Sequence, residues 1–364
     1  MKKILLLLIT ILFISCSESK KDIQKETISN FVELVKNDVR DDNINGSISL
    51  VVVHKDSTLI LESFGEADEQ TIFRIGSITK SFTGFLMLQL QQEGVLNIND
   101  PVEKYVPEIK NLIDYSKFSP ITLKQLASHT SGLDRESRNR SINSGKVNEW
   151  ESKVLLGISE TSFRSKPGER FRYSNFGYAI LGLAISKAAN KPYIKLVEEK
   201  IFTPLKMNNS FFEIPENKIQ FLAKGIAGGP TAELNFDFPK REHLGRGYRV
   251  PNGGIYSTAS DMAKFLKTCM GFSPLLTKES IQLLQTTQTP SKRLRSNYSF
   301  GFDLYSAQGI NTVGHRGSTP GYSAHIEFEK DSEFGVILLR NYNFGNTNLD
   351  LRANALLRKL SLKK

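Results

Sequence analysis

A serine and a lysine three residues apart open an apolar segment, and these two residue types can carry out nucleophilic catalysis. Ser77 and Lys80 stand in "FRIGSITKSFTGFLMLQL". Residues three apart in a helix share one face, so the lysine amine can approach the serine hydroxyl. The helix N-terminus and burial both disfavour the lysine cation, which lowers its pKa and lets a neutral amine take the serine proton. Taken alone, the pair also fits a capping serine beside a lysine that reaches solvent.

A tyrosine and an asparagine form a second candidate group. Tyr173 and Asn175 stand in "KPGERFRYSNFGYAILG", where the pattern predicts a turn just before an apolar helix. A tyrosine hydroxyl beside a lysine can transfer protons, and an asparagine amide can orient both a lysine and a substrate carbonyl. The alternative interpretation is a turn with a half-buried tyrosine.

The third group is a histidine followed by a glycine on a predicted strand. His315 and Gly317 stand in "TVGHRGSTPGY". Gly317 would let a substrate backbone approach the strand closely. The same spacing occurs at His243 and Gly245, but "KREHLGRGY" is a polar loop with no strand around it. His315 is therefore the better candidate.

The remaining sequence predicts the elements that must position these residues. Two β-branched runs within residues 46–65, separated by "HKDS", predict a β-hairpin. An apolar helix over 81–93, closed by Gly94, is hydrophobic nearly all round, which favours a place deep in the core. From about residue 120 helical patterns alternate with turns, and strand patterns return after about residue 240, followed by a closing helix.

Strands at both ends with helices between them predict an α/β (α+β) fold. Its α/β part comprises residues 41–119 and 241–364, and an all-helical insertion occupies about 120–240. A composition of 39% hydrophobic and 24% charged residues is ordinary for a globular protein with a substantial core. A cleft between the two parts is the natural place for a site.

The first residues predict export and a lipid anchor. "MKKILLLLITILFISC" has two lysines and then an apolar run too short to span a bilayer, so residues 1–15 are predicted to be a signal peptide. Ser15 before Cys16 resembles the lipobox of bacterial lipoproteins, which implies a lipid on Cys16. Residues 16–40 then form a polar tether and a helix near 31–39. The second serine–lysine pair, Ser17 and Lys20 in "SESK", lies in this tether and is interpreted as a solvated linker.

Cysteine, charge and histidine patterns narrow the function classes. Cys16 and Cys269 are the two cysteines, so acylation of Cys16 leaves Cys269, which is predicted to be a buried helix residue. The net charge of +10 accompanies no long basic run and no zinc-finger spacing. An anionic membrane surface therefore explains the charge better than nucleic acid does. The histidines show no metal-ligand spacing, and no metal or cofactor is expected.

The three groups, in this order and context, resemble the serine β-lactamase and penicillin-binding-protein superfamily. The likeness is greatest to its class C β-lactamase-like branch, which includes D,D-peptidases, D-aminopeptidases and esterases. It extends from about Ile44 to the closing helix and is carried by "FRIGSITKSFT", "LASHTSGL", "PGERFRYSNFGY", "GGIYSTASDMAKF" and "GHRGSTPGY". The resemblance implies an antiparallel sheet flanked by helices, with an all-helical domain beside it.

The resemblance also implies roles for individual residues. Ser77 would be the nucleophile that accepts the acyl group, activated by Lys80. Tyr173 would act as general base in acylation and deacylation, and Asn175 would position substrate and Lys80. The backbone N–H groups of Ser77 and Ser318 would form the oxyanion hole.

One position departs from the pattern of the superfamily. His315 stands where many β-lactamases have the lysine of Lys-Thr-Gly. A group largely neutral at pH 7 attracts a substrate carboxylate less, so weak or absent β-lactamase activity is expected. Protonation near the ordinary histidine pKa of about 6.5 is expected to restore part of the charge. Arg316 could compensate for the missing charge, but an arginine on a predicted edge strand is expected to face solvent. His129 in "SHTSGL" matches a motif of structural character.

The leading hypothesis is a lipid-anchored serine hydrolase of the bacterial cell envelope, facing the periplasm or the exterior. It would form an acyl-enzyme on Ser77 with a small ester or a D-amino-acid or peptidoglycan-type peptide. The alternative is a catalytically idle penicillin-binding or scaffold lipoprotein that retains the fold. The sequence leaves the substrate and the oligomeric state open.

Overall fold

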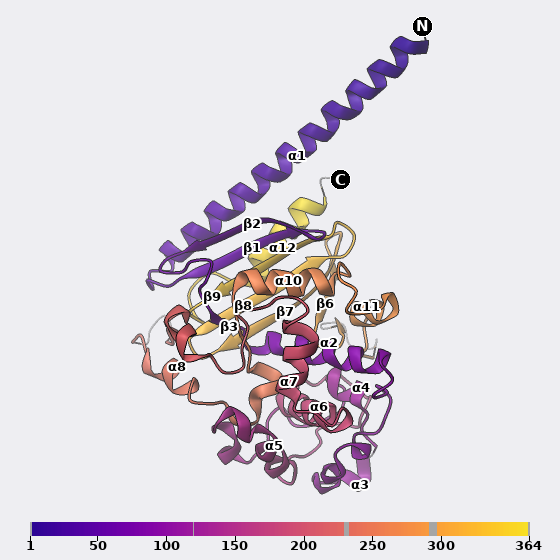
Figure 1. Ribbon diagram of the computed structural model, residues 1–364, viewed down its shortest axis with the longest axis vertical. Coiled ribbons are helices and arrows are strands. Elements are labelled where there is room, and N and C mark those ends of the chain that lie inside the picture. Colours follow the sequence, from indigo (N-terminus) through magenta and orange to yellow (C-terminus); the bar gives the residue numbers. More distant parts are fainter. Residues whose placement is uncertain (1, 119, 229–232, 291–296, 363–364) are drawn as a thin grey trace.

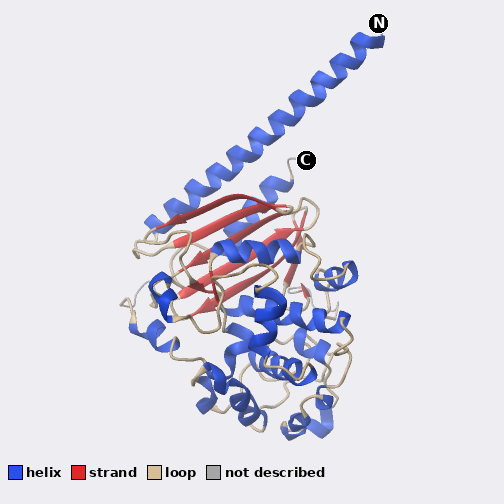
Figure 2. Ribbon diagram, in the orientation of Figure 1, coloured by secondary structure: helices blue, strands red, loops and turns tan. Residues whose placement is uncertain are grey.

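The computed structural model describes residues 2–118, 120–228, 233–290 and 297–362, with side chains described from residue 21 onward except at position 242. An antiparallel sheet with helices on both faces forms one part of the molecule, and a group of helices forms the other (Figures 1 and 2). The predicted α/β fold, with a sheet flanked by helices, is confirmed.

Seven strands form the main sheet, in the order β2-β1-β9-β8-β7-β6-β5. Their bounds are β1 (Ile48–His54), β2 (Ser57–Phe64), β5 (Asn297–Tyr298), β6 (Asp303–Ala307), β7 (Ile310–Thr319), β8 (Tyr322–Glu329) and β9 (Phe334–Arg340). The pairing of β1 with β9, for example Val51 opposite Ile337, joins the two ends of the chain. The β-hairpin and the C-terminal meander therefore form as the alternating patterns predict.

Helices cover both faces of the sheet. α12 (Leu349–Ser361) and the C-terminal part of α1 (Lys2–Asp41) pack on one face, in a cluster that includes Phe31, Val35 and Leu357. α10 (Ala259–Cys269) lies on the other face (Figure 1). Cys269 is buried at the end of α10 and forms no disulfide, as expected of an apolar helix position.

The helical part holds most of the middle of the chain. Its α-helices are α3 (Tyr115–Phe118), α4 (Leu123–Ala127), α5 (Trp150–Ile158), α6 (Asn175–Ala188) and α7 (Tyr193–Val197). α8 (Asp237–Glu242), α9 (Val250–Gly253) and α11 (Lys278–Leu284) follow in the return toward the sheet. A two-stranded pair, β3 (Phe73–Arg74) with β4 (Tyr256–Ser257), forms a separate small sheet and was not predicted, because two residues carry no periodicity.

α2 (Thr79–Gln92) is the apolar helix predicted over 81–93, and it begins two residues earlier. Every residue from Thr79 to Leu90 is buried, so the helix lies between the sheet and the helical part. Gly94 follows it with φ +72, a conformation that favours glycine after a helix. α2 therefore holds the side chains of its first turn at a fixed position from which water is excluded.

The N-terminal segment is one continuous helix rather than a tether followed by a short helix. α1 runs from Lys2 to Asp41 and leaves the sheet at an angle, with the N-terminus far from the domain (Figure 1). A search of the described residues finds no helix long and apolar enough to cross a bilayer. The signal peptide and the lipid on Cys16 stay predictions.

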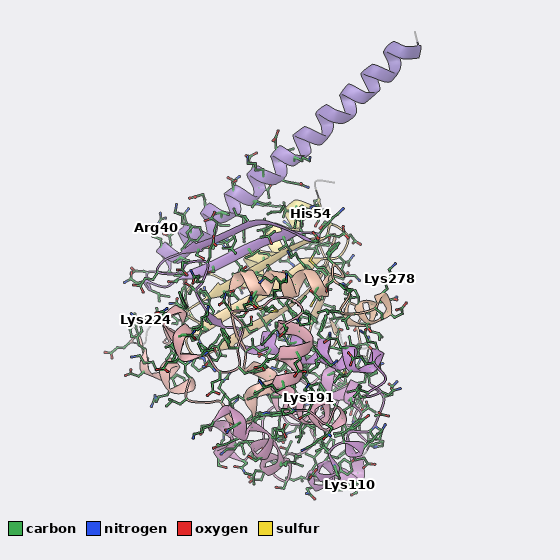
Figure 3. The ribbon with its side chains drawn as sticks, viewed as in Figure 1. Arg40, His54, Lys110, Lys191, Lys224 and Lys278 are labelled. Carbon is green, nitrogen blue, oxygen red and sulfur yellow. The ribbon has the colours of Figure 1, made fainter. Side chains whose placement is uncertain are left out.

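Cationic side chains are distributed over separate elements. Arg40, Lys110, Lys191, Lys224 and Lys278 lie far apart around the molecule in Figure 3, from α1 to the helical part. The net charge of +10 is therefore shared among distant surface positions that include these five.

Candidate active site

Ser77 lies in a short 3₁₀ turn, η1 (Gly76–Ile78), that leads directly into α2. Gly76 has φ +52, and an added Cβ there would lie 2.9 Å from the backbone nitrogen of Ser318 on β7. Glycine is thus required on both conformational and steric grounds. The turn consequently holds Ser77 against the edge of β7, next to Ser318.

Lys80 is fully buried one turn after Ser77. Its Nζ lies 3.2 Å from Ser77 Oγ and donates to the backbone oxygen of Asn252 at 2.9 Å. Burial lowers the pKa of Lys80 well below its ordinary value, while the carboxylate of Glu136 acts in the opposite direction. A buried amine with a depressed pKa beside a hydroxyl is the arrangement that activates a serine.

Tyr173 completes the surroundings of the amine. Nζ of Lys80 lies 4.8 Å from the centre of the Tyr173 ring. Burial raises the pKa of the Tyr173 hydroxyl above its ordinary value, and its hydrogen bond with Ser77 acts in the opposite direction. The structure therefore brings Ser77, Lys80 and Tyr173 together, so a proton can pass among their three polar atoms.

The turn that carries Tyr173 is held by His129. Nδ1 of His129 accepts the backbone N–H of Ser174 at 3.1 Å, and its ring centre lies 4.2 Å from that of Tyr173. Ser174 in turn caps α6 by accepting from the N–H of Gly177. Burial lowers the pKa of His129 well below its usual range. These contacts agree with the structural role expected of "SHTSGL".

Asn175 is placed differently from the expectation. Its Nδ2 donates to Glu136 Oε1 at 2.6 Å, and its backbone oxygen accepts from Asn252 Nδ2 at 3.0 Å. Within the described ranges no hydrogen bond joins Asn175 directly to Lys80. Asn252 links the two, since its side chain binds Asn175 and its carbonyl binds Lys80.

His315 is buried on β7, with only 3% of its surface exposed. Nε2 lies 2.9 Å from the hydroxyl of Tyr298, and Nδ1 lies 2.6 Å from the carbonyl oxygen of Arg316. Burial, together with the nearby Lys80, lowers the pKa of His315 to about 3. The expectation that His315 gains a proton near pH 6.5 is therefore wrong, because desolvation penalises the imidazolium.

β7 is an interior strand of the sheet, not the edge strand expected from the sequence, but half of it has a free side. Its ladder with β6 ends at the pair Asp303 and Gly314, so residues 315–319 extend beyond β6. Arg316 is mostly exposed, as expected, and pairs with Asp350 at 2.9 Å. This free length of β7 faces the turn that carries Ser77.

Gly317 serves a different contact from the one expected. A Cβ added there would lie 1.9 Å from the carbonyl oxygen of Ile75, two residues before Ser77. The absence of a side chain therefore lets β7 approach the protein's own backbone rather than that of a substrate. Ser77, Gly317 and Ser318 line one cleft as a result.

The cleft has a volume of ≈ 730 Å³ and takes its walls from segments that lie far apart in sequence. Besides Ser77, Tyr173 and His315, its walls include Arg135, Asp303, Arg316, Arg340 and Asp350. A substrate there would meet groups of both charges. The cleft is large enough for a small ester or a short peptide.

Three residues that lie outside the catalytic motifs hydrogen-bond the site residues, and the sequence did not predict them. Glu136, Asn252 and Tyr298 bind Asn175, Lys80 and His315 across separations of 39, 172 and 17 residues. Glu136 lies in a bend and Asn252 in the short helix α9, and neither position has a periodic pattern that would mark it.

The fold and the serine–lysine pair at the mouth of a buried helix define a class, that of β-lactamases and penicillin-binding proteins. A family model described as Beta-lactamase matches residues 31–360. The chain belongs to this family.

Curated relatives of the chain include proteins of Dictyostelium discoideum and Staphylococcus aureus. Beta-lactamase-like protein 2 of Dictyostelium discoideum is 30% identical over 327 residues, which cover 84% of this chain and 57% of the relative. Protein flp of Staphylococcus aureus strain N315 is 26% identical over 326 residues, which cover 85% of this chain and 62% of the relative. The chain thus spans less than two thirds of the length of these relatives.

Solved structures support the fold. The octameric penicillin-binding protein homologue from Pyrococcus abyssi superposes with a TM-score of 0.75 at 25% identity, covering 93% of this chain and 78% of that one. A class C beta-lactamase superposes with a TM-score of 0.74 at 19% identity, covering 93% and 96%. At 19% identity, the similarity to the class C beta-lactamase shows a shared fold alone.

Proposed function

We propose that this protein is a serine hydrolase that forms an acyl-enzyme on Ser77 with a small ester or a D-amino-acid-type amide. The observation that carries the proposal is the 3.2 Å approach of the buried Lys80 amine to Ser77 Oγ. Burial lowers the pKa of Lys80, so a neutral amine is available at the nucleophile.

The chemistry follows from the three polar atoms. Ser77 Oγ adds to the substrate carbonyl while its proton passes to the neutral Lys80 amine, either directly or through the Tyr173 hydroxyl, which gives up its own proton as it receives one. The N–H groups of Ser77 and Ser318 would receive the developing oxyanion. The same proton then goes to the leaving alcohol or amine as the carbonyl–leaving group bond breaks. Water repeats the sequence on the acyl-enzyme and releases the acid.

The rival function is a catalytically idle scaffold that keeps the fold. A cleft filled by the protein's own side chains, or a Ser77–Lys80 pair too far apart for a hydrogen bond, would favour the scaffold. The cleft volume of ≈ 730 Å³ and the Lys80–Ser77 contact favour the hydrolase instead. In this proposal the chain is held at the bacterial cell envelope by a lipid on Cys16.

Intact-mass measurement of the protein after exposure to p-nitrophenyl acetate and, separately, to benzylpenicillin tests the proposal. The ester should add one acetyl group, which peptide mapping places on Ser77, and Ser77→Ala should add none. The penicillin adduct should form slowly, because the buried neutral His315 supplies no cation for its carboxylate. An acetyl group on Ser318, or equal turnover by Ser77→Ala, would overturn the assignment.

A further inference from the structure

A second cavity lies beside the catalytic cleft, on the side of the sheet covered by α12. Its volume is ≈ 290 Å³. Asp303, His315, Arg316 and Asp350 line both cavities. The shared wall lies at the start of β6, where the ladder with β7 stops at Asp303. A group attached to a substrate in the cleft can therefore extend into this space.

The cavity wall carries more carboxylates than cations among its described residues. Asp303, Glu327 and Asp350 face one guanidinium, that of Arg316, which pairs with Asp350 at 2.9 Å. In the described part of the chain no side chain donates a hydrogen bond to Asp303. Burial raises the pKa of Asp303 to about 6, because the attraction of Arg316 and His325 only partly offsets desolvation.

His325 provides an independent observation that points to a ligand. It is 5% exposed, lines the cavity, and its Nε2 lies 3.3 Å from Glu327 Oε2. A carboxylate accepts hydrogen bonds, so Nε2 carries a hydrogen toward Glu327. That Nδ1 atom has no partner among the described residues. A buried ring nitrogen without a partner is costly, and a polar group of a ligand would offset that cost.

The rest of the wall suits the carbon skeleton of such a ligand. Leu304, Tyr305 and Leu351 border the same space and can contact methylene or aromatic carbons. The described residues include no group of three or more His, Cys, Asp or Glu side chains arranged to hold a metal ion. An organic ammonium fits this combination of acceptors and apolar surface.

We infer that the second cavity binds a protonated amine carried by the acyl part of the substrate, with the Asp303 carboxylate as its acceptor. The inference rests on the proposed function, since the amine must belong to an ester or amide that acylates Ser77. It makes amine-bearing acyl compounds the preferred substrate class over neutral ones of the same shape.

Two p-nitrophenyl esters of equal shape test the preference. One carries a 4-(aminomethyl)benzoyl group, which is cationic, and the other a 4-ethylbenzoyl group, which is neutral. The ratio of their second-order acylation rates at pH 7.5 should favour the cation in the wild type. It should fall about fivefold in Asp303→Asn, the scale expected of one partly exposed charge. Asp350→Asn provides a second variant at the exposed start of α12, with a fall in the same direction.

Asp114→Asn is the matched control. It removes the same charge from an exposed position beside α3, at the opposite end of the molecule from α12 (Figure 1). Its rate ratio should equal that of the wild type. Equal ratios in wild type, Asp303→Asn and Asp350→Asn would overturn the subsite while leaving ester hydrolysis, and hence the proposed function, intact.

A binding measurement tests the subsite independently of the proposed hydrolase activity. Saturation-transfer NMR on Ser77→Ala should detect benzylammonium but not benzyl alcohol at equal concentration. Adding Asp303→Asn to that protein should remove the benzylammonium signal. Binding that depends on Asp303, together with no acylation of the wild type by either ester, would uphold the subsite and refute the hydrolase. A signal equal for both compounds would refute the subsite.

Discussion

Lys80 Nζ lies 3.2 Å from Ser77 Oγ in a position with no solvent exposure. The ammonium form would have to be desolvated there, and burial accordingly lowers the pKa of Lys80 well below its ordinary value. The carbonyl of Asn252 orients the amine, which leaves the nitrogen aimed at the hydroxyl. This geometry fits the roles proposed for the pair, Lys80 as base and Ser77 as nucleophile.

Replacing Lys80 by arginine should nearly abolish acylation of Ser77. A guanidinium stays protonated and cannot accept the serine proton. The loss should be about 10³-fold, within the range for removing a general base. The amplitude and rate of the p-nitrophenol burst measure it. Lys110→Arg, at an exposed residue paired with Glu103, is the control and should keep the wild-type burst. Retention of a tenth of the activity in Lys80→Arg would contradict the assignment.

Removing the hydroxyl of Tyr173 should slow both acylation and deacylation. Tyr173→Phe keeps the ring against Lys80 but removes one proton carrier, so a fall of about 10²-fold is expected. Stopped-flow kinetics with an aryl ester, followed by intact mass, separates the two steps.

Tyr193→Phe is matched to this change. Tyr193 is also buried, and its hydroxyl hydrogen-bonds Thr83 at 2.7 Å, away from Ser77. It should cost about 1 kcal/mol of stability and leave both rates near wild type. Equal kinetic losses in the two variants would show that Tyr173 acts through stability alone.

The parts of the site that local rules govern could be predicted from the sequence. The three-residue spacing of Ser77 and Lys80 on a helix, and the alternation that places His315 on a strand, depend on neighbours in the chain. Both placements were predicted, and so were the hairpin, the buried helix and the C-terminal meander.

The parts that depend on distant segments could not be predicted. The environment of His315 comes from Tyr298 and Lys80, so its low pKa has no local signature. Gly317 meets Ile75, and Asn175 meets Glu136, across long separations that no periodicity encodes. The same holds for Asp303, the first residue of β6. Only the register of the sheet shows that its carboxylate lies where the β6–β7 ladder stops, beside the cleft.

The anchor prediction concerns Cys16. In a bacterial host the full chain should partition into detergent and with membranes, and Cys16→Ser should not mature normally. The diacylglyceryl group of a lipoprotein gives stable attachment, whereas one acyl chain holds only marginally. Phase partitioning and intact mass of the purified chain measure this, with Cys269→Ser as the control for loss of a thiol. A freely soluble mature chain that begins beyond Cys16 would remove the claim.

Acid should destabilise the fold through its buried histidines. Burial lowers the pKa of His243 to about 4, so between pH 6.5 and 4 the unfolded chain binds a proton that the folded chain does not. The stability that this neutral residue contributes is present above pH 6.5 and is lost as the pH falls toward 4. The slope is about 1.4 kcal/mol per pH unit for each such histidine.

The measurement is the free energy of unfolding by urea across pH 4 to 8. His243→Gln should reduce its slope by about one proton between pH 6.5 and 4 and leave the slope between pH 7 and 8 unchanged. The comparison with wild type cancels the contributions of the carboxylates. An unchanged slope in the acid range would show that His243 is protonated in the folded state.

The last prediction concerns which residue sets the pH dependence toward anionic substrates. His315, with a pKa of about 3, does not change charge between pH 5.5 and 8.5. Asp303 does, since burial raises its pKa to about 6 against the opposing influence of Arg316 and His325. Its carboxylate repels the carboxylate of a penicillin in the same cleft, and this repulsion disappears on protonation.

The ratio of acylation by benzylpenicillin to acylation by a neutral aryl ester should therefore rise as the pH falls below about 6. A change of several-fold is expected, corresponding to ~1 kcal/mol for a charge in a partly exposed cleft. Asp303→Asn should raise the ratio at pH 8.5 and make it flat. His315→Lys should raise it and keep a rise on acidification, shifted to lower pH, because the added cation leaves Asp303 in place but lowers its pKa. A ratio that keeps its pH dependence in Asp303→Asn would assign the titration to another group.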